Sequence, residues 1–128
     1  MERRFKNREL LAFLRRLIGA HMTAPGKGLP IGALTSQHFA NFYIDGCDRF
    51  LLEHSKVHGL VRYMDDIVWW ADSKAAVRET LEAVTEFLRT RRQLEIKLPV
   101  GIGRSSRGMS FCGFRILPGA ILLSRRRR

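Results

Sequence analysis

The chain has 128 residues, with 23 lysines and arginines against 12 aspartates and glutamates, which gives a formal net charge of +11. A hydrophobic content of 45% excludes disorder of the whole chain, and the length limits it to one compact domain. No apolar run approaches the roughly 18 residues of a membrane span or forms a signal peptide, so the expected compartment is the cytoplasm.

The strongly basic composition indicates nucleic acid as the first partner to consider, and an anionic lipid surface as the second. The alternative is a generic basic surface with no specific partner. The two cysteines, Cys47 and Cys112, form no CxxC pair, so neither a disulfide framework nor a cysteine zinc site is expected. Both are interpreted as small buried hydrophobic residues.

Two helices separated by a loop are predicted first along the chain. Leucine and isoleucine recur at spacings of three and four over residues 10–18, which predicts a basic amphipathic helix that ends at a glycine. Two prolines and three glycines over residues 24–32 predict a loop. An apolar stripe then predicts a second helix over about residues 33–53, capped by Thr35 or Ser36.

A tight hairpin is predicted over residues 60–71, where two β-rich apolar runs flank Asp65 and Asp66. Asp72 or Ser73 would then cap a third helix. The apolar stripe of that helix has clean helical spacing and consists of Val77, Leu81, Val84 and Leu88.

Strands are predicted over residues 94–98 and 109–117, around a glycine- and serine-rich loop. A Pro-Gly turn precedes a last apolar run over residues 120–123. The expected order is therefore helix, loop, helix, hairpin, helix, hairpin. It indicates an α/β fold of the α+β type, with an antiparallel sheet backed by helices.

Asp65 and Asp66 are the candidate metal ligands. Adjacent carboxylates at a turn between valine-, isoleucine- and tryptophan-rich strands are held rigidly, which suits the oxygen coordination of Mg²⁺. In a two-metal site, such carboxylates hold ions about 4 Å apart that act on the attacking and leaving phosphate oxygens. An ordinary turn is the alternative, because aspartate is a preferred turn residue. Asp45 and Asp48 are interpreted as surface or capping acids of the second helix.

The sequence Tyr-Met-Asp-Asp at residues 63–66 resembles the catalytic hairpin of reverse transcriptases, and three further segments match that family in the expected order. Residues 28–41 are similar to the family's loop and helix that support the template and the base of the incoming nucleotide. Lys97 resembles the lysine near the nucleotide phosphates. Phe111-Cys112-Gly113-Phe114 looks like the primer-grip hairpin, with cysteine in place of the usual leucine.

The resemblance implies a polymerase palm that extends a DNA primer on an RNA template, using deoxynucleoside triphosphates and two Mg²⁺ ions, with Mn²⁺ as a substitute. It implies that Asp65 and Asp66 are catalytic and hold the metal, and that Tyr63 supports the primer end. The implied template and nucleotide side consists of Gly32, Ser36 and Gln37. The pattern of Ile31-Gly32 and Ser36-Gln37 is closest to that of prokaryotic retroelement enzymes of the diversity-generating and group II intron-like kind.

The resemblance further implies a partial palm over residues 1–124 and, over residues 125–128, a basic tail that begins a thumb. The fingers, the thumb and the strand with the family's upstream metal-binding aspartate are not matched. A metal site without that carboxylate is expected to be inactive alone. A fragment, a decayed copy and one piece of a split enzyme remain alternatives, and the missing portion or a second copy is an expected partner.

Two other classes of function stay open. A non-catalytic remnant would bind nucleic acid through its basic surface, and its aspartates would be structural. A membrane-surface protein would bind lipid through its first helix, although no membrane is expected as a partner.

Overall fold

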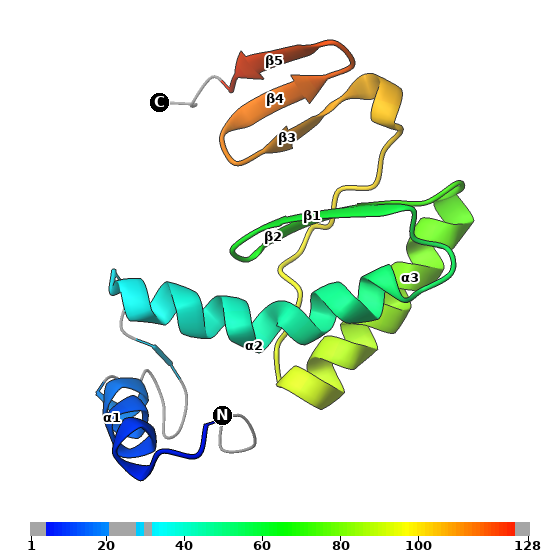
Figure 1. Ribbon diagram of the computed structural model, residues 1–128. Coiled ribbons are helices and arrows are strands. Elements are labelled where there is room, and N and C mark those ends of the chain that lie inside the picture. Colours follow the sequence, from blue (N-terminus) through cyan, green and yellow to red (C-terminus); the bar gives the residue numbers. More distant parts are fainter. Residues whose placement is uncertain (1–4, 21–27, 30–31, 125–128) are drawn as a thin grey trace. The chain divides into compact units, whose positions relative to one another are not determined.

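The computed structural model describes residues 5–20, 28–29 and 32–124 (Figure 1). The chain divides into two compact units, Met1–Phe42 and Tyr43–Arg128. Most of the predicted loop over residues 24–32 and the whole arginine tail over residues 125–128 lie outside the described residues.

Helix α1, Arg8–Gly19, belongs to the N-terminal unit and confirms the first predicted helix. The Asn7 side chain begins the helix by accepting a hydrogen bond from the backbone N–H of Leu10 at 3.0 Å. Glu9 lies in the first turn and Arg16 in the last. These charges complement the helix dipole, because the N-terminal end of a helix is partially positive and the C-terminal end partially negative.

Helix α2, Leu34–Leu52, begins in the N-terminal unit and continues in the second. Its extent agrees with the predicted helix, but the predicted cap at Thr35 or Ser36 is wrong. The backbone N–H of Ser36 already bonds to the Ala33 carbonyl at 3.0 Å, so both residues lie within the first turn.

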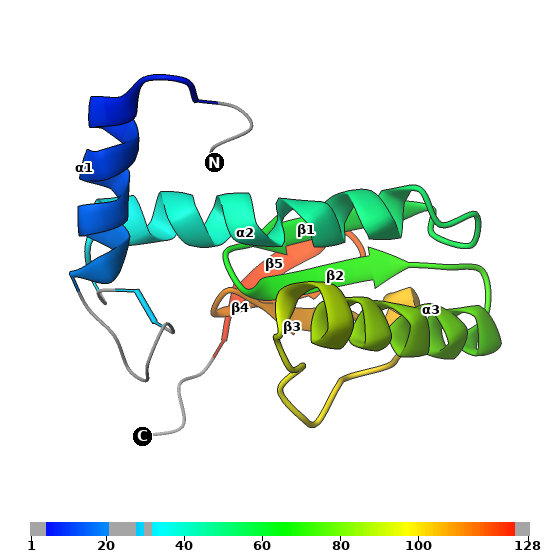
Figure 2. The ribbon, with the colours of Figure 1, turned by 90° about the horizontal axis from the view of Figure 1, so that it is seen from below.

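The second unit is built on the antiparallel pair β1, Gly59–Tyr63, and β2, Asp66–Trp70. Helix α2 and helix α3, Lys74–Phe87, cover one face of this hairpin (Figures 1 and 2). The buried hydrophobic residues come from α2, α3 and the turn after α3, and are Cys47, Leu51, Val84 and Leu88. The apolar stripe predicted for the third helix is therefore confirmed as a core-facing stripe.

The strand register decides which hairpin residues face the helices. Leu60 pairs with Trp69 and Arg62 with Ile67, so these four residues share a face, because side chains alternate along a strand. Leu60, Ile67 and Trp69 pack against the core, and Trp69 Nε1 donates a hydrogen bond to Thr80 Oγ1 of α3 at 2.9 Å. Arg62 is thus a charged residue on an otherwise apolar face.

The chain leaves α3 through a π-helical turn, Leu88–Arg92, which the sequence does not predict. The strand predicted over residues 94–98 is wrong. Leu94 and Ile96 are partly buried against the core while their neighbours are exposed, as alternation requires, but the described residues contain no strand that pairs with this segment. Periodicity without a hydrogen-bonding neighbour leaves the segment irregular.

Arg92 ends that turn and packs over α2 at Gly46. Its guanidinium lies 5.6 Å from the Tyr43 ring centroid and 5.7 Å from that of Phe87. A Cβ atom at position 46 would collide with Arg92 Nη2, so glycine makes room for the arginine. Tyr43 Oη also donates a hydrogen bond to the Arg92 carbonyl at 2.7 Å, which joins the two segments.

A second antiparallel sheet follows in the order β3, Met109–Phe111, then β4, Phe114–Leu117, then β5, Ala120–Leu123. A 3-10 turn, Ser105–Arg107, precedes it. Strand β5 is exposed along its whole length, with Leu123 at 80% exposure. This apolar surface is of the kind that partner proteins cover.

The architecture is mixed α and β, as predicted, with three α-helices and two small antiparallel sheets in the described residues. The prediction of one antiparallel sheet is not met, because β2 and β3 do not pair. Over the described residues, no helix is both long and apolar enough to cross a membrane.

Candidate active site

Asp65 and Asp66 lie at the closed end of the β1–β2 hairpin. Tyr63 pairs with Asp66, so Met64 and Asp65 form a two-residue loop, and Asp66 is the first residue of β2. The predicted tight hairpin with the acids at its turn is therefore confirmed. Both aspartates are exposed, so their carboxylates are accessible to a ligand from solution.

The backbone of this turn is strained at Met64, whose φ is 56°. A bulky residue rarely adopts positive φ, because its side chain then crowds the backbone. Strain of this kind persists only where the surrounding structure holds it, and it concentrates at functional sites. The strands below are held by core packing, which makes the turn a rigid support for the two carboxylates.

A bidentate ion pair between Arg62 and Asp48 lies beneath the turn, and it was not predicted from the sequence. Arg62 Nε lies 2.8 Å and 2.9 Å from the two carboxylate oxygens of Asp48, and Nη2 lies 2.8 Å from Oδ2. The two side chains are only 14% and 20% exposed. The hydrogen bond to Asp48 raises the pKa of Arg62 above its usual range, so the guanidinium stays charged.

The interpretation of Asp48 as a surface or capping acid is therefore wrong. Arg62 points to the helix-covered face of the hairpin, where an unpaired charge would be costly, and α2 supplies the carboxylate. Asp45 does stay at the surface, where it pairs with the exposed side chain of Arg49. Asp48 lies between Ile44 and Leu51 on the core-facing stripe of α2, and this position was the available signal.

The predicted primer-grip residues form a second two-residue turn, because Phe111 pairs with Phe114. Cys112 and Gly113 both have positive φ, 49° and 83°. Cys112 is exposed, so its interpretation as a buried hydrophobic residue is wrong, whereas that of Cys47 is confirmed. Cysteine at the tip of a turn has no core to enter.

The two turns lie at the same end of the second unit (Figures 1 and 2). Partial desolvation and the negative charge of Asp66 both raise the pKa of the Cys112 thiol. The Asp66 carboxylate is thus close enough to Cys112 to act on it electrostatically.

Tyr63 and Lys97 are both exposed. Tyr63 lies directly opposite Asp66 and is 61% exposed, on the face of the hairpin that the helices leave open. Lys97 lies in the irregular segment after the π-helical turn rather than on the predicted strand. Its proposed place near nucleotide phosphates remains a prediction.

The three template-side candidates belong to the N-terminal unit. Gly32 has φ of 87°, a conformation that favours glycine, and a Cβ atom added there would meet no described atom within 4 Å. Ser36 and Gln37 lie in the first turns of α2, with Gln37 exposed. Ser36 Oγ is buried and has no hydrogen-bond partner among the described residues. Their roles toward a template remain predictions.

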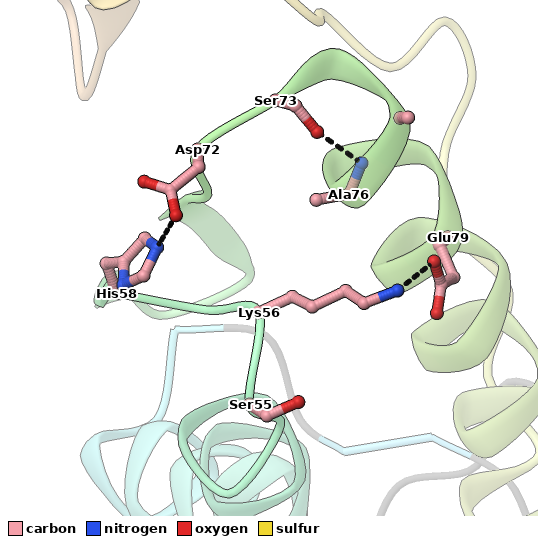
Figure 3. Close-up of a pocket in the computed structure, with 8 residues that line it drawn as sticks. Ser55, Lys56, His58, Asp72, Ser73, Ala76 and Glu79 are labelled. Atoms are coloured by element: carbon pink, nitrogen blue, oxygen red, sulfur yellow. Dashed lines mark hydrogen bonds and ion pairs between the residues drawn. The ribbon is translucent and has the colours of Figure 1, made fainter.

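A shallow cavity of about 350 Å³ lies at the opposite end of the β1–β2 hairpin (Figure 3). Its polar side chains pair with one another: His58 Nε2 lies 2.8 Å from Asp72 Oδ2, and Lys56 pairs with Glu79. The hydrogen bond from Lys56 lowers the pKa of Glu79. Because these side chains are paired with one another and largely exposed, the cavity is a weaker candidate than the strained turn.

Within the described residues, no group of three or more histidine, cysteine or acidic side chains could hold a metal ion. Asp65 and Asp66 thus offer two carboxylates, which is part of a coordination shell. Neither the known family models nor the curated proteins match this chain.

Proposed function

We propose that this chain is the palm portion of a reverse transcriptase-like nucleotidyltransferase, an RNA-directed DNA polymerase whose metal ligands include Asp65 and Asp66. The observation that carries the proposal is the turn itself. Two adjacent exposed carboxylates follow a methionine at φ 56°, on a hairpin anchored in the core. A two-residue hairpin turn requires positive φ at its first loop residue, and here methionine occupies that position in place of the usual glycine or asparagine.

The chemistry of the donors suits a hard divalent cation. Mg²⁺ is usually bound by one or two carboxylates and keeps several waters and substrate phosphates as its other ligands. When bound, it would neutralise charge on the phosphate oxygens and orient them. A complete two-metal site needs a further carboxylate, which in this proposal comes from the missing portion of the enzyme or from a second copy.

The remaining assignments follow the resemblance. Tyr63, exposed opposite Asp66, would support the primer end, and residues 111–114 would hold the primer strand beside the metal ligands. The support for residues 111–114 is that their turn lies at the same end of the second unit as the turn with the two aspartates (Figures 1 and 2). Gly32, Ser36 and Gln37 would contact the template and nucleotide, and Lys97 the phosphates.

A second candidate function is nucleic-acid binding without catalysis. The net charge of +11 favours it, because a basic surface binds phosphates without requiring a metal. In that case the affinity would fall steeply with salt, and the aspartates at the turn would not matter.

Primer extension on an RNA template with Mg²⁺ separates the two candidates. The chain is compared with the Asp65→Asn, Asp66→Asn double variant and with Asp72→Asn, which removes an exposed aspartate at the other end of the same hairpin. Because the chain alone is expected to be inactive, we expect synthesis only where a second copy or the missing portion completes the site; the double variant then loses it and Asp72→Asn keeps it. Synthesis unchanged in the double variant contradicts the proposal. Where no variant shows synthesis, salt-sensitive binding of primer and template that is indifferent to Mg²⁺ and to the double variant favours the second candidate, and Mg²⁺-dependent binding that the double variant loses favours the first.

A further inference from the structure

Arg62 connects helix α2 to the strained turn. One edge of its guanidinium makes the bidentate pair with Asp48 of α2. Its Nη1 donates a hydrogen bond to the backbone carbonyl of Met64 at 2.9 Å. A single side chain thus holds both the helix and the turn residue whose φ is 56°.

The bond to Met64 acts at the point that aims the carboxylates. In a two-residue loop, a change of φ at Met64 rotates the peptide that follows and redirects Asp65. The Met64 conformation is unfavourable for a residue with a side chain, so the hairpin would relax unless something held it. The hydrogen bond from Arg62 to the Met64 carbonyl is such a restraint.

We propose that Arg62, braced by Asp48, is a positioning residue that holds the turn in the conformation in which Asp65 and Asp66 face a divalent cation. This inference rests on the proposed function for its purpose, although the restraint itself can be tested without it. Asp48 supplies the fixed anchor, because a bidentate carboxylate leaves the planar guanidinium little freedom to rotate. Lysine could not replace Arg62, because its ammonium lacks the fork that serves two partners at fixed angles.

The alternative is that the pair only fastens strand β1 to helix α2. A charge swap, Asp48→Arg with Arg62→Asp, separates the two roles. The swapped pair can still fasten strand to helix, but residue 62 would then carry an acceptor where the Met64 carbonyl needs a donor. If the pair only fastens strand β1 to helix α2, the swapped chain keeps the left-handed Met64 of the native chain. If Arg62 positions the turn, the swapped chain loses the left-handed Met64.

The matched control is on the same helix. Arg49 also pairs with an aspartate, Asp45, but both side chains are largely exposed. Arg49→Gln therefore removes an arginine from an ion pair without touching the turn.

The test uses nuclear magnetic resonance on the full chain. The HN–Hα coupling and Cα shift of Met64 report whether its φ is left-handed, and added Mn²⁺ broadens the amide signals of nearby residues. We expect the native chain and Arg49→Gln to show a left-handed Met64 and Mn²⁺ broadening at Asp65 and Asp66. In Arg62→Lys, Arg62→Gln and the charge swap, Met64 loses that signature and the Mn²⁺ affinity falls by roughly tenfold, as for other residues that orient metal ligands.

A left-handed Met64 that persists in Arg62→Gln, or in the charge swap, overturns the inference. If Arg62→Gln does not fold, Arg62→Lys decides whether Arg62 holds the turn, because lysine keeps the positive charge and nearly the same side-chain length. A native chain whose turn is not broadened by Mn²⁺ counts against the proposed metal site. The Met64 signature still decides whether Arg62 holds the turn, so the two failures are distinguishable.

Discussion

The β1–β2 and β3–β4 hairpins close with turns of the same length, yet they hold a left-handed residue by different means. At the first turn, Met64 is held from outside the loop by Arg62, which is itself anchored to α2. At the second, Cys112 is followed by Gly113, which adopts positive φ at no cost, and the Gly113 carbonyl accepts a hydrogen bond from Ser124 at 2.9 Å.

The two turns therefore differ in which interactions hold their backbone conformation. The second turn obtains its shape from local chain chemistry, since two positive φ values with glycine in second place suit a two-residue hairpin. The first turn has aspartate at the position where the second has glycine. Its conformation is supported instead by Arg62, which pairs with Asp48 on the helix-covered face of the hairpin. The strained residue of the first turn is Met64 and not either aspartate, so the two carboxylates lie on a turn whose shape is supported by Arg62 rather than by glycine.

The largest expected effect comes from removing the external anchor. Asp48→Asn leaves Arg62 without its ionic partner on a partly buried face. We expect it to lower the free energy of unfolding by about 2 to 3 kcal/mol, somewhat less than for a fully buried pair. Asp45→Asn breaks an exposed pair and is expected to cost less than about 0.5 kcal/mol. Urea unfolding measures both, and equal losses would remove the contrast between the two pairs.

The next effect is the pH dependence of stability that the buried thiol of Cys47 in helix α2 produces. Burial, and then the charge of Asp48, raise the pKa of Cys47 to about 11. The folded state therefore retains a proton that the unfolded state loses, so stability falls as the pH rises from about 9 to about 11. The loss is on the order of 2 kcal/mol.

The alkaline loss can be assigned by comparing two variants. Cys47→Ala should remove this part of the pH dependence, and Cys112→Ala should leave it intact, because Cys112 is exposed. Chemical unfolding at several pH values provides the measurement. A Cys47→Ala chain with the same alkaline slope as the native chain would show that another group is responsible.

The smallest effect is at the second turn. Cys112→Asn creates Asn-Gly, the pair most favoured where both loop residues have positive φ. Asparagine tolerates this conformation better than cysteine, so we expect a gain of about 0.5 to 1 kcal/mol. Thermal unfolding would register it as a higher midpoint. A lower midpoint would mean that Cys112 makes contacts in the native chain that outweigh the strain.

The sequence was sufficient where a single element carries the signal. Helix α3 could be predicted from its apolar stripe, which contains the buried Val84 and Leu88, and Ser73, one of its two predicted caps, accepts a hydrogen bond from the Ala76 amide at 3.1 Å. The hairpin turn at Asp65 could be predicted because the apolar runs on both sides are short and symmetrical.

The sequence was insufficient where the outcome depends on what two elements do together. The alternation over residues 94–98 is real, but a strand also needs a neighbour to pair with, and periodicity says nothing of that. Likewise, the pairing of Arg62 with Asp48 depends on the β1–β2 register, which places Arg62 on the helix-covered face. A register shifted by one residue would have turned Arg62 to solvent.

The most direct test of the central claim is a Mn²⁺ titration of the native chain followed by amide broadening. The account predicts that the signals of residues 64–67 broaden first, and that the Asp65→Asn, Asp66→Asn double variant loses this effect while Asp72→Asn keeps it. Broadening that begins at Asp72 and Glu79 instead, or that is unchanged in the double variant, would contradict the assignment of the strained turn as a metal site.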